Sequence, residues 1–422
     1  MISLPPFQPP APFTDADAAL AQVRRIYDAG CAHLRNALAA YIAGPAEPQG
    51  PLTRVRAFYP FVRLHVPHGR HPDTRLAYGF VSHAGHYETT LTRPDLFADY
   101  DLEQFRQLLA NHGATLEVGT SSKPIPLPFA LAEDEHFEGS LSAAQRQCLP
   151  DVFDLPDLTA MDDRIANGTH TTAPGDPEPL ALFTAPRVDY SLHRLRHYTG
   201  TSPEHFQNFV LFTNYQFYID EFIALGQLEM QNADTPYSAF VQPGNVITRR
   251  AGLGGGDEGG TPPPRLPQMP AYHLVRPDRS GISFVNIGVG PSNAKTITDH
   301  IAVLRPHAWI MVGHCAGLRN SQQLGDYVLA HGYVREDHVL DEDLPLWIPV
   351  PALAEVQIAL QDAVADVTGL KDDALKRVMR TGTVATTDNR NWELLGAGAP
   401  QRRFSQSRAV ALDMESATIA AN

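Results

Sequence analysis

The chain has 422 residues, of which 43 % are hydrophobic, which is enough for two or three globular domains with their own cores. It carries 47 acidic and 33 basic residues, and this net charge of −14 argues against a nucleic-acid or anionic-membrane partner for the whole protein. A small anionic substrate remains compatible with this charge, because a few local arginines can hold one phosphate.

The three cysteines, Cys31, Cys148 and Cys315, are widely spaced and suggest neither a disulfide framework nor a metal-binding pair. We therefore expect no metal site, and free thiols fit a reducing cytoplasm. The N-terminal residues lack a basic segment followed by a long apolar run, and no apolar stretch is long enough to cross a bilayer. Neither a signal peptide nor a membrane segment is expected.

The first region combines helices with short strands. After a Pro-rich start, the spacing of apolar residues predicts an amphipathic helix that Thr14 caps and Gly44-Pro45 ends. A Gly-, Pro- and Thr-rich stretch at 165–180 marks a boundary. We therefore predict an α+β domain over residues 1–180. Its further predicted elements are strands at 55–58, 61–66, 76–81 and 87–91 and a helix at 101–110.

The second region alternates between strands and helices. Residues 181–232 are predicted to be mainly helical, with aromatic side chains that pack in the core. The Gly-rich loop at 252–260 lacks a strong strand before it and a helix after it, so we do not expect it to bind phosphate. The alternation predicts an α/β domain over residues 181–422, with a mostly parallel sheet covered on both faces. The predicted strands are 282–287, 309–312, 326–330, 382–386 and 409–412, and the predicted helices are 292–304 and 352–367.

Two strand ends in this domain carry glycines suited to ligand binding, which in α/β sheets occurs beyond the carboxyl ends of strands. Gly244 allows the backbone to approach a ligand closely, and Arg249 or Arg250 can form a bidentate contact with a phosphate or a carboxylate. Gly288 and Gly290 expose backbone N–H groups at the start of a helix, where an anion is favoured.

Two further strand ends carry polar groups that could bind a sugar. His314 follows one strand, and Asp413 and Glu415 flank Met414 after another. A carboxylate can accept two hydrogen bonds from a sugar diol, and a methionine offers a polarizable apolar surface. The same residues also fit structural roles, with His314 in a turn, Asp413 as a helix cap and Glu415 in solvent.

Together the four strand ends resemble the purine nucleoside phosphorylase and nucleosidase superfamily, in which such segments surround one nucleoside. Longer runs are similar to the AMP nucleosidase family within it, and this resemblance covers nearly the whole chain. It implies an α/β/α sandwich of the nucleoside phosphorylase type behind an α+β regulatory domain. The runs that carry the resemblance are 78–81, 87–95, 209–218, 267–273, 286–291, 312–319, 337–341 and 387–392.

This resemblance implies hydrolysis of the N-glycosidic bond of AMP to adenine and ribose 5-phosphate, through a transition state that resembles a ribosyl cation. Glu415 is then expected to hold the ribose hydroxyls, with Met414 beside the sugar. Asp413 precedes them and is shorter than the glutamate of relatives. The resemblance places the base site at Asn389, Arg390 and Trp392, with adenine stacking on either Arg390 or Trp392.

Departures from the phosphorylases indicate whether water or phosphate attacks the ribose. Met311 stands where relatives that use phosphate carry an arginine, and His314 replaces a small hydroxyl residue. The absence of this phosphate-binding arginine favours hydrolysis over phosphorolysis. Gly244 and Arg249 are then expected to hold the 5′-phosphate of AMP, or inorganic phosphate as an inhibitor.

Two alternatives remain at this stage. One is a purine nucleoside phosphorylase, which requires phosphate and releases ribose 1-phosphate. The family's general acid, an aspartate that protonates N7 of the purine, follows the Asp413–Glu415 segment on a later strand, and we expect this C-terminal end to be missing from the sequence. The second alternative is therefore a truncated, non-catalytic nucleotide-binding protein.

For the first domain the resemblance implies regulation, with ATP and Mg²⁺ as activator and inorganic phosphate as inhibitor, in a homo-hexamer of the bacterial cytoplasm without nucleic-acid or membrane partners. The residues themselves do not indicate where an effector binds. The basic side chains in the strand region could bind a nucleotide phosphate or form a solvated sheet face; these are Arg54, Arg56, Arg63 and Arg75.

Overall fold

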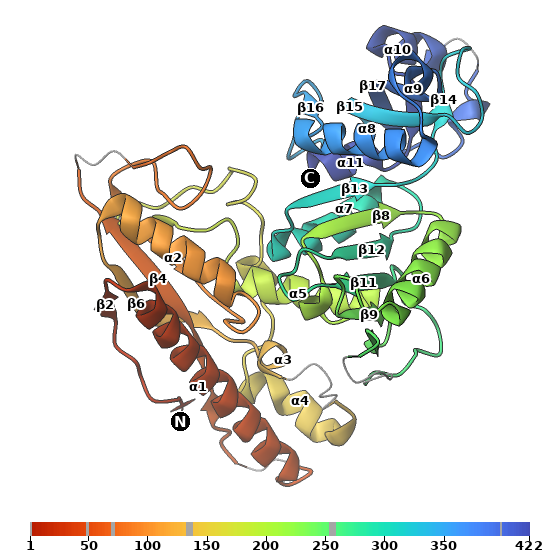
Figure 1. The fold of residues 1–422 in the computed structure, drawn as a ribbon. Helices are drawn as coiled ribbons and strands as arrows, with labels where there is room; N and C mark the ends of the chain where they lie inside the picture. The colour runs from red at the N-terminus through yellow and green to blue at the C-terminus, as the bar shows by residue number, and fades with distance from the viewer. Residues whose placement is uncertain (1, 48–49, 69–71, 132–137, 253–258, 397–398) are drawn as a thin grey trace. The chain divides into compact units, whose positions relative to one another are not determined.

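The structure is a computed structural model that describes residues 2–47, 50–68, 72–131, 138–252, 259–396 and 399–422. The chain divides into two compact units, Met1–His193 and Arg194–Asn422, and Figure 1 labels most of their helices and strands. Most of the Gly-rich loop at 252–260, namely residues 253–258, lies outside the described residues.

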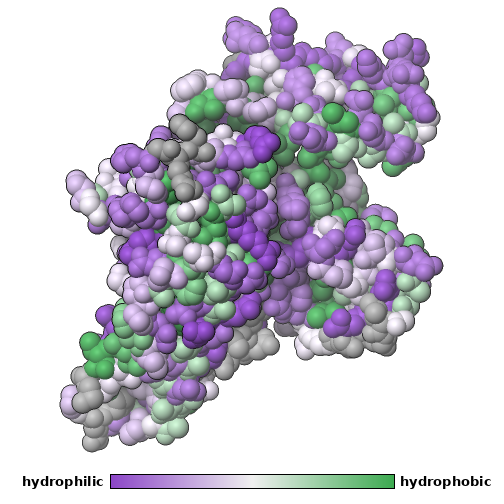
Figure 2. All heavy atoms as spheres, turned by 60° about the vertical axis from the view of Figure 1, so that its left-hand side comes forward, coloured by the Kyte–Doolittle hydropathy of each residue, from purple (hydrophilic) through white to green (hydrophobic). Residues whose placement is uncertain are grey.

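The surface mixes hydrophilic and hydrophobic residues over the face that Figure 2 shows. No helix of the described residues is both long enough and apolar enough to cross a membrane.

The first unit contains a five-stranded sheet in the order β2-β6-β4-β5-β7. Its strands pair antiparallel except for β5 and β7, and the short β1 pairs with β3 separately. The strands are β1 (Ile2–Ser3), β2 (Ala11–Phe13), β3 (Arg54–Val55), β4 (Phe58–Val66), β5 (Gly85–Thr90), β6 (Leu116–Pro124) and β7 (Glu178–Pro179). The helices are α1 (Ala16–Ala43), α2 (Ala98–His112), α3 (Leu127–Ala130), α4 (Ala143–Val152) and α5 (Ala185–Thr199), which continues into the second unit.

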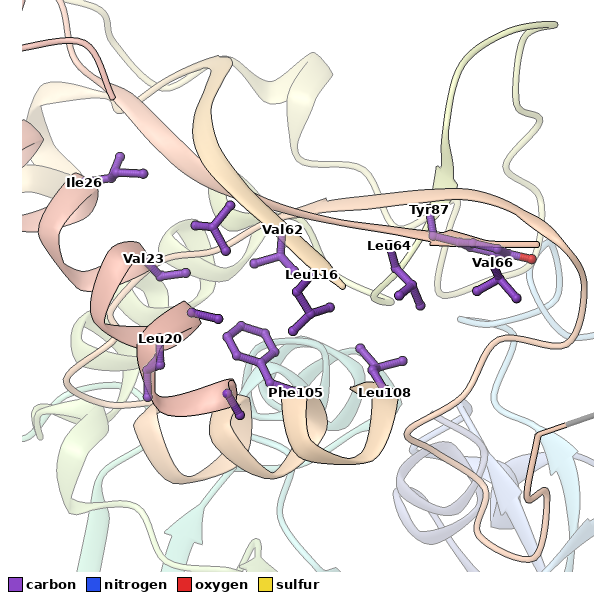
Figure 3. Packing of buried hydrophobic residues seen from close by; sticks show 13 residues of the cluster. Leu20, Val23, Ile26, Val62, Leu64, Val66, Tyr87, Phe105, Leu108 and Leu116 are labelled. Atoms are coloured by element: carbon purple, nitrogen blue, oxygen red, sulfur yellow. The ribbon is translucent and has the colours of Figure 1, made fainter. Parts of the chain in front are cut away.

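Helix α1 forms where the sequence predicts it, with one difference at its start. Asp15, and not Thr14, is the N-cap, because its carboxylate accepts a hydrogen bond from the Ala18 N–H at 2.8 Å. Gly44 ends the helix as expected. Figure 3 shows apolar side chains of α1 and α2 packed against β4 and β6, and this cluster includes Leu20, Val23, Ile26, Val62, Leu64, Phe105, Leu108 and Leu116.

The strand predicted at 76–81 is wrong. These residues form bends, and Leu76 and Tyr78 are exposed. Gly79 has a φ of 77°, which belongs to the left-handed region and cannot continue an extended strand.

A buried carboxyl group ties α5 to the sheet of the first unit. Asp189 accepts hydrogen bonds from the Tyr59 hydroxyl at 2.6 Å and from the Thr92 hydroxyl at 2.8 Å, and it is 3 % exposed. Burial raises the pKa of Asp189 to about 7, although the two hydroxyls act in the opposite direction. The group is therefore neutral in the folded protein over a range where it is ionised after unfolding.

This pKa shift predicts a measurable dependence of stability on pH. Between pH 5 and pH 7 the folded state keeps a proton on Asp189 that the unfolded state has released, so its contribution to the free energy of unfolding falls as pH rises. Asp189→Asn stays neutral at every pH. The free energy of unfolding of the variant minus that of the wild type should therefore be about 3 kcal/mol larger at pH 8 than at pH 5. Urea titration at both pH values measures this difference.

The control for this prediction is Asp157→Asn, because Asp157 is a fully exposed carboxylate. Equal pH dependence of unfolding in the wild type and in Asp189→Asn would contradict the buried-acid assignment.

The second unit contains two mixed sheets, in the orders β10-β9-β11-β12-β8-β13 and β14-β18-β17-β15-β16. The strands are β8 (Phe209–Thr213), β9 (Ala239–Gln242), β10 (Val246–Arg249), β11 (Ala271–Val275), β12 (Ile282–Asn286), β13 (Ala308–Met311), β14 (Ala316–Gly317), β15 (Tyr327–Glu336), β16 (Val350–Pro351), β17 (Met379–Thr387) and β18 (Ala411–Asp413). The helices are α6 (Gln216–Gln231), α7 (Pro291–Ile301), α8 (Ala354–Thr368), α9 (Asp372–Val378), α10 (Ala399–Ser407) and α11 (Ser416–Ala421).

The predicted α/β class is confirmed, and the parallel pairing occupies the part of each sheet that positions the site. Strands β12, β8 and β13 are parallel to one another, as are β15, β17 and β18. The pairings that involve β9, β10, β11, β14 and β16 are antiparallel, so the sheets are mixed rather than mostly parallel.

The prediction of mainly helical structure over 181–232 missed a strand. Residues Phe209–Thr213 form β8, which lies between β12 and β13 with Val210 and Phe212 fully buried. A strand buried on both faces is a continuous apolar run and shows no alternation, so its sequence is hard to distinguish from a buried helix.

Candidate active site

The site is centred on Glu415, which lies at the N-terminus of α11 directly after β18 and Met414. Its side chain is 2 % exposed, and its Oε1 accepts a hydrogen bond from the Gly290 N–H at 2.7 Å. Gly290 follows β12, so this bond joins the ends of strands from the two sheets of the second unit. The structure thus brings together two of the strand ends that the sequence singled out.

Gly288 and Gly290 shape the backbone that faces Glu415. Their φ angles are 69° and 110°, in a region that side chains with a Cβ rarely adopt. Gly290 is the N-cap of α7, and Pro291 occupies the first turn of that helix. The carboxyl group of Glu415 therefore meets the positive end of a helix dipole.

Asn214 is a second partner of Glu415 that the sequence analysis missed. It follows β8, and the interaction of its side chain with the Glu415 carboxyl group lowers the pKa of Glu415. The Asn214 Oδ1 is buried and has no hydrogen-bond partner among the described residues.

The electrostatic environment of Glu415 keeps it close to its ionisation point at neutral pH. Burial raises the pKa of Glu415 to about 7, and the charge of Asp413 adds to this increase. The Gly290 N–H and Asn214 act in the opposite direction, because they donate hydrogen bonds to the ionised form. No ion pair of Glu415 occurs among the described residues.

Asp413 has a different environment, although only Met414 separates it from Glu415. Its carboxylate accepts hydrogen bonds from the Thr386 hydroxyl and from the Ser416 N–H, the latter at 2.9 Å. Burial raises the pKa of Asp413, while Ser416 and Thr386 oppose that shift. Both oxygens are thus engaged by protein donors at the start of α11, and this arrangement positions the helix. Met414 is partly buried.

His314 lies in an exposed group of aromatic rings beside Asn214. Its ring centroid is 4.3 Å from that of Tyr215 and 5.5 Å from that of Phe217. Phe217 is 46 % exposed, so this ring is available to a ligand and is not part of the core. We call Tyr215, Phe217, Tyr218 and His314 the aromatic cluster.

Gly244 lies on the turn between β9 and β10, where the protein itself occupies its surroundings. Its φ is 84°, and a Cβ there would lie 2.0 Å from the carbonyl oxygen of Thr261. Its N–H donates to the Gly200 carbonyl at 2.7 Å, and its carbonyl accepts from the Thr261 N–H at 3.0 Å. A close approach of the chain, and not of a ligand, accounts for this glycine.

Arg249 is separated from the glycine and from Glu415. Strand β10 runs antiparallel to β9, and Arg249 pairs with Ala239 at the start of β9. The end of β9 points in the same direction as the end of β12, which leads to Gly290. Arg249 therefore lies at the opposite edge of the sheet from Glu415.

The segment with Asn389, Arg390 and Trp392 follows β17, whose end lies beside that of β18. The Asn389 N–H donates to the Thr387 hydroxyl at 3.2 Å, and the Asn389 Oδ1 accepts from the Asn391 N–H at 3.0 Å. Trp392 packs edge-on against Phe404 with a centroid distance of 6.3 Å, whereas Arg390 is exposed. The topology thus places this segment at the same sheet edge as Glu415.

The arginines proposed for an effector phosphate in the first unit are all paired with carboxylates. Arg54 and Arg56 both contact Asp154, at 2.6 and 3.1 Å. Arg63 contacts Glu88 and Glu117, and Arg75 contacts Asp73. Among the described residues of both units, no cluster of three or more histidine, cysteine, aspartate or glutamate side chains could hold a metal ion.

Comparison with known proteins assigns both parts of the chain to one family. The family model "Bacterial AMP nucleoside phosphorylase N-terminus" matches residues 18–177, and the model "Phosphorylase superfamily" matches residues 272–421. The AMP nucleosidases of Escherichia coli strain K12 and of Escherichia coli O157:H7 are each 47 % identical to this chain over 414 residues. These alignments cover 96 % of this chain and 82 % of each relative.

A solved structure, the AMP nucleosidase from Bacteroides thetaiotaomicron VPI-5482, is 24 % identical over 55 % of this chain and 82 % of that chain, with a TM-score of 0.41. This superposition is too partial to support the assignment to a family. The assignment rests on sequence identity along nearly the whole chain. The resemblance of the strand ends and longer runs is thereby confirmed, and the chain belongs to the AMP nucleosidase family.

Proposed function

We propose that this chain hydrolyses the N-glycosidic bond of AMP, with Glu415 as the group that binds the ribose and stabilises its developing charge. The observation that carries the proposal is the buried carboxyl group of Glu415, which Gly290 holds at the meeting point of strand ends from both sheets. Identity of 47 % to curated AMP nucleosidases supports the substrate.

The chemistry follows from how charge moves when the bond between C1′ and N9 breaks. The bonding electrons leave with adenine, which takes up a proton, and positive charge spreads over C1′ and the ring oxygen of the ribose. A water molecule adds to C1′ and loses a proton, which balances the proton that adenine takes up, and ribose 5-phosphate results. An ionised Glu415 in a low-dielectric site accepts hydrogen bonds from the ribose hydroxyls, and these bonds strengthen as the positive charge develops.

The remaining substrate contacts are assigned by their positions around Glu415. Met414 precedes it and offers an apolar surface to the sugar. Gly288 and Gly290 present backbone to the same space, and His314 with the rest of the aromatic cluster forms the wall next to Asn214. Adenine is assigned to the segment with Asn389 and Arg390, because Trp392 is engaged by Phe404.

Phosphorolysis is the second candidate reaction, since phosphorylases share the fold described by the matched family model. Met311 disfavours it, because a thioether cannot replace the charge of an arginine that binds phosphate. Incubation of the full chain with AMP, ATP and Mg²⁺, in buffer with and without phosphate and followed by chromatography, separates the two reactions. Adenine and ribose 5-phosphate support hydrolysis, whereas adenine release that requires phosphate supports phosphorolysis, and no adenine at all overturns both.

Regulation, assembly and location are proposed on the family resemblance. We propose that ATP with Mg²⁺ activates the enzyme, that inorganic phosphate inhibits it, and that six chains assemble in the cytoplasm. The match of residues 18–177 to an N-terminal model of this family supports a regulatory first unit. An effector phosphate that bound Arg54, Arg56 or Arg63 would have to displace a carboxylate partner first.

Replacing the central carboxylate tests the mechanism. Glu415→Gln keeps the size of the side chain but removes the negative charge that stabilises the ribosyl cation. We expect kcat for adenine release to fall by about 10²–10³-fold, with a much smaller change in KM. Glu355→Gln, at the exposed start of α8, is the matched control. A Glu415→Gln enzyme with wild-type kcat would remove Glu415 from the mechanism.

The pH dependence of the reaction provides a second test. The active form of Glu415 is ionised, and its pKa is raised to about 7, so kcat/KM should fall about tenfold per pH unit as pH decreases below 7. Rates measured from pH 5.5 to 8.5 should show this limb in the wild type, and the residual activity of Glu415→Gln should lack it. A flat wild-type profile between pH 5.5 and 7 would contradict the assignment.

The position of Arg249 gives a third prediction. Because Arg249 lies at the opposite sheet edge from Glu415, we expect Arg249→Ala to change KM for AMP by less than about threefold. An increase of KM by tenfold or more, at unchanged thermal stability, would show that Arg249 binds the 5′-phosphate after all. Initial rates at varied AMP concentration decide between these outcomes.

A further inference from the structure

We propose that Thr418, Asp337 and Arg335 are positioning residues, which fix helix α11 and thereby hold the Glu415 carboxyl group in place. The inference rests on the proposed function, in which Glu415 acts on the ribose. None of the three side chains is part of the site described above.

Helix α11 sets the orientation of Glu415. Glu415 is the N-cap of this helix, and its carbonyl accepts a hydrogen bond from the Ile419 N–H at 3.0 Å. The position of Glu415 therefore depends on the contacts that hold α11 against the rest of the unit.

One of these contacts is a hydrogen bond between two fully buried side chains. The Thr418 hydroxyl donates to Asp337 Oδ2 at 2.6 Å, and both residues are 0 % exposed. Asp337 directly follows β15 and is 81 positions from Thr418 in the chain. A hydrogen bond to an ionised carboxylate is stronger and more directional than one between neutral groups.

Arg335 forms a buried ion pair with Asp337. Its guanidinium is 2 % exposed and contacts Asp337 Oδ1 at 3.2 Å, Asp341 at 3.2 Å and the Leu344 carbonyl at 2.5 Å. Asp337 Oδ2 accepts a longer hydrogen bond from Arg335 Nε at 3.4 Å and the shorter one from the Thr418 hydroxyl at 2.6 Å. A buried ion pair contributes little net stability compared with apolar packing, so its use here points to orientation rather than to stability.

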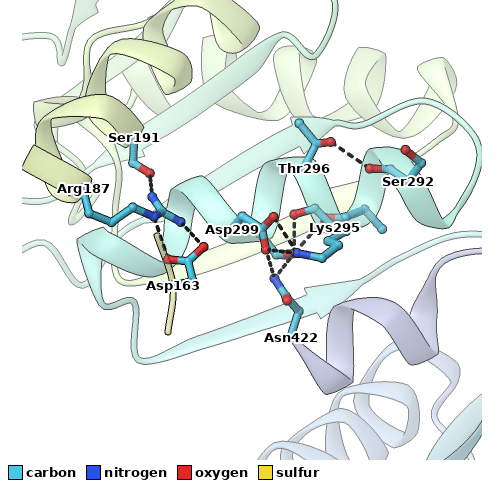
Figure 4. Close-up of polar contacts among 10 residues, drawn as sticks. Asp163, Arg187, Ser191, Ser292, Lys295, Thr296, Asp299 and Asn422 are labelled. Atoms are coloured by element: carbon cyan, nitrogen blue, oxygen red, sulfur yellow. Dashed lines mark hydrogen bonds and ion pairs between the residues drawn. The ribbon is translucent and has the colours of Figure 1, made fainter. Parts of the chain in front are cut away.

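The other anchors of α11 hold different parts of the helix. The Thr386 hydroxyl accepts from the Ala417 N–H at 2.9 Å, next to Asp413 at the helix start. Figure 4 shows Asn422 at the far end, where its amide donates to Asp299 on α7 at 2.8 Å. Thr418 lies between these two ends and joins the helix to the end of β15, so it opposes rotation of α11 about its axis.

Rotation of α11 would move Glu415 relative to Gly290, whose N–H is fixed by α7. A displacement of about 1 Å in a catalytic group can lower a rate by roughly 10²-fold, because the interaction with the transition state depends on geometry. The segment with Asn389 and Arg390, to which the base is assigned, is not part of α11, so contacts with the base would persist. Loss of the Thr418 hydroxyl should therefore lower kcat while KM stays nearly constant.

The test compares Thr418→Val, which keeps the shape but lacks the hydroxyl, with Thr418→Ser, which keeps the hydroxyl. In the full chain we expect Thr418→Val to lower kcat at least tenfold with KM changed less than threefold, and Thr418→Ser to retain kcat within threefold. Thr296→Val is the matched control, because Thr296 lies on α7 and its hydroxyl bonds only the Ser292 carbonyl among the described residues. Unchanged kcat in Thr418→Val would overturn the proposal.

A double variant separates positioning from a general structural effect. If Thr418 acts through Glu415, Thr418→Val should lower kcat by less than threefold in the Glu415→Gln background. An equal loss in both backgrounds would overturn the proposal. Should Thr418→Val fail to fold, as judged by circular dichroism, Thr418→Ala takes its place with the same expectations.

The position of Glu415 can also be measured without turnover. Carbon-13 NMR of labelled glutamate, with the Glu415→Gln spectrum as the reference for assignment, follows the ionisation of this one group. We expect Thr418→Val to shift the pKa of Glu415 by at least half a unit, and an unchanged pKa would overturn the proposal. If the wild type released no adenine from AMP, the proposed function would fail, whereas the positioning role would still be decided by this titration.

Discussion

The hydrogen bond from the Gly290 N–H to Glu415 is the contact on which the candidate site depends. It joins a loop after the first sheet of the second unit to the start of a helix after the second sheet. It requires the positive φ angles of Gly288 and Gly290, which side chains with a Cβ rarely adopt, and it requires that α11 stay in place. The buried carboxyl group of Glu415 therefore contacts the loop after one sheet while it is carried by the helix after the other sheet.

The contrast between Asp413 and Glu415 shows how side-chain length divides their roles. The shorter Asp413 reaches Thr386 and the N–H of Ser416, close to its own backbone, and both of its oxygens are engaged there. The longer Glu415 extends to a loop 125 positions away and to Asn214, and it contacts no cation among the described residues. Asp413 thus stabilises the helix that carries Glu415, and Glu415 is left as the group that can respond to a ligand.

Most of the site could be predicted from the sequence, because strand ends and glycines are recognisable from a few neighbouring residues. Glu415, Gly288 and Gly290 were expected at strand ends, and the structure brings Glu415 and Gly290 into contact. The sequence does not indicate Asn214, because β8 is a buried apolar run whose pattern also fits a helix, so no strand end is evident before Asn214. Gly244 has a positive φ. The close approach of the Thr261 carbonyl, and not of a ligand, explains why this position requires a glycine.

Sequence patterns do not predict contacts between residues that lie far apart in the chain. The antiparallel pairing of β10 with β9 places Arg249 at the opposite sheet edge from Glu415, and nothing in the run of residues from Gly244 to Arg249 shows this reversal. The hydrogen bond between Thr418 and Asp337 spans 81 positions, and a threonine within a short helix carries no signal of its partner.

A carboxyl group without a cationic partner is well suited to stabilise a transient cation. Burial raises the pKa of Glu415 from 4.5 to about 7, which corresponds to about 3 kcal/mol of unfavourable free energy for the ionised form. A neighbouring arginine would remove this cost in the ground state, but it would also compete with the substrate. Neutral groups stabilise it, namely the backbone of Gly290 and Met414 and the side chain of Asn214, so the carboxylate gains most when positive charge develops on the ribose. The interaction is then stronger in the transition state than in the bound substrate, and this difference lowers the barrier.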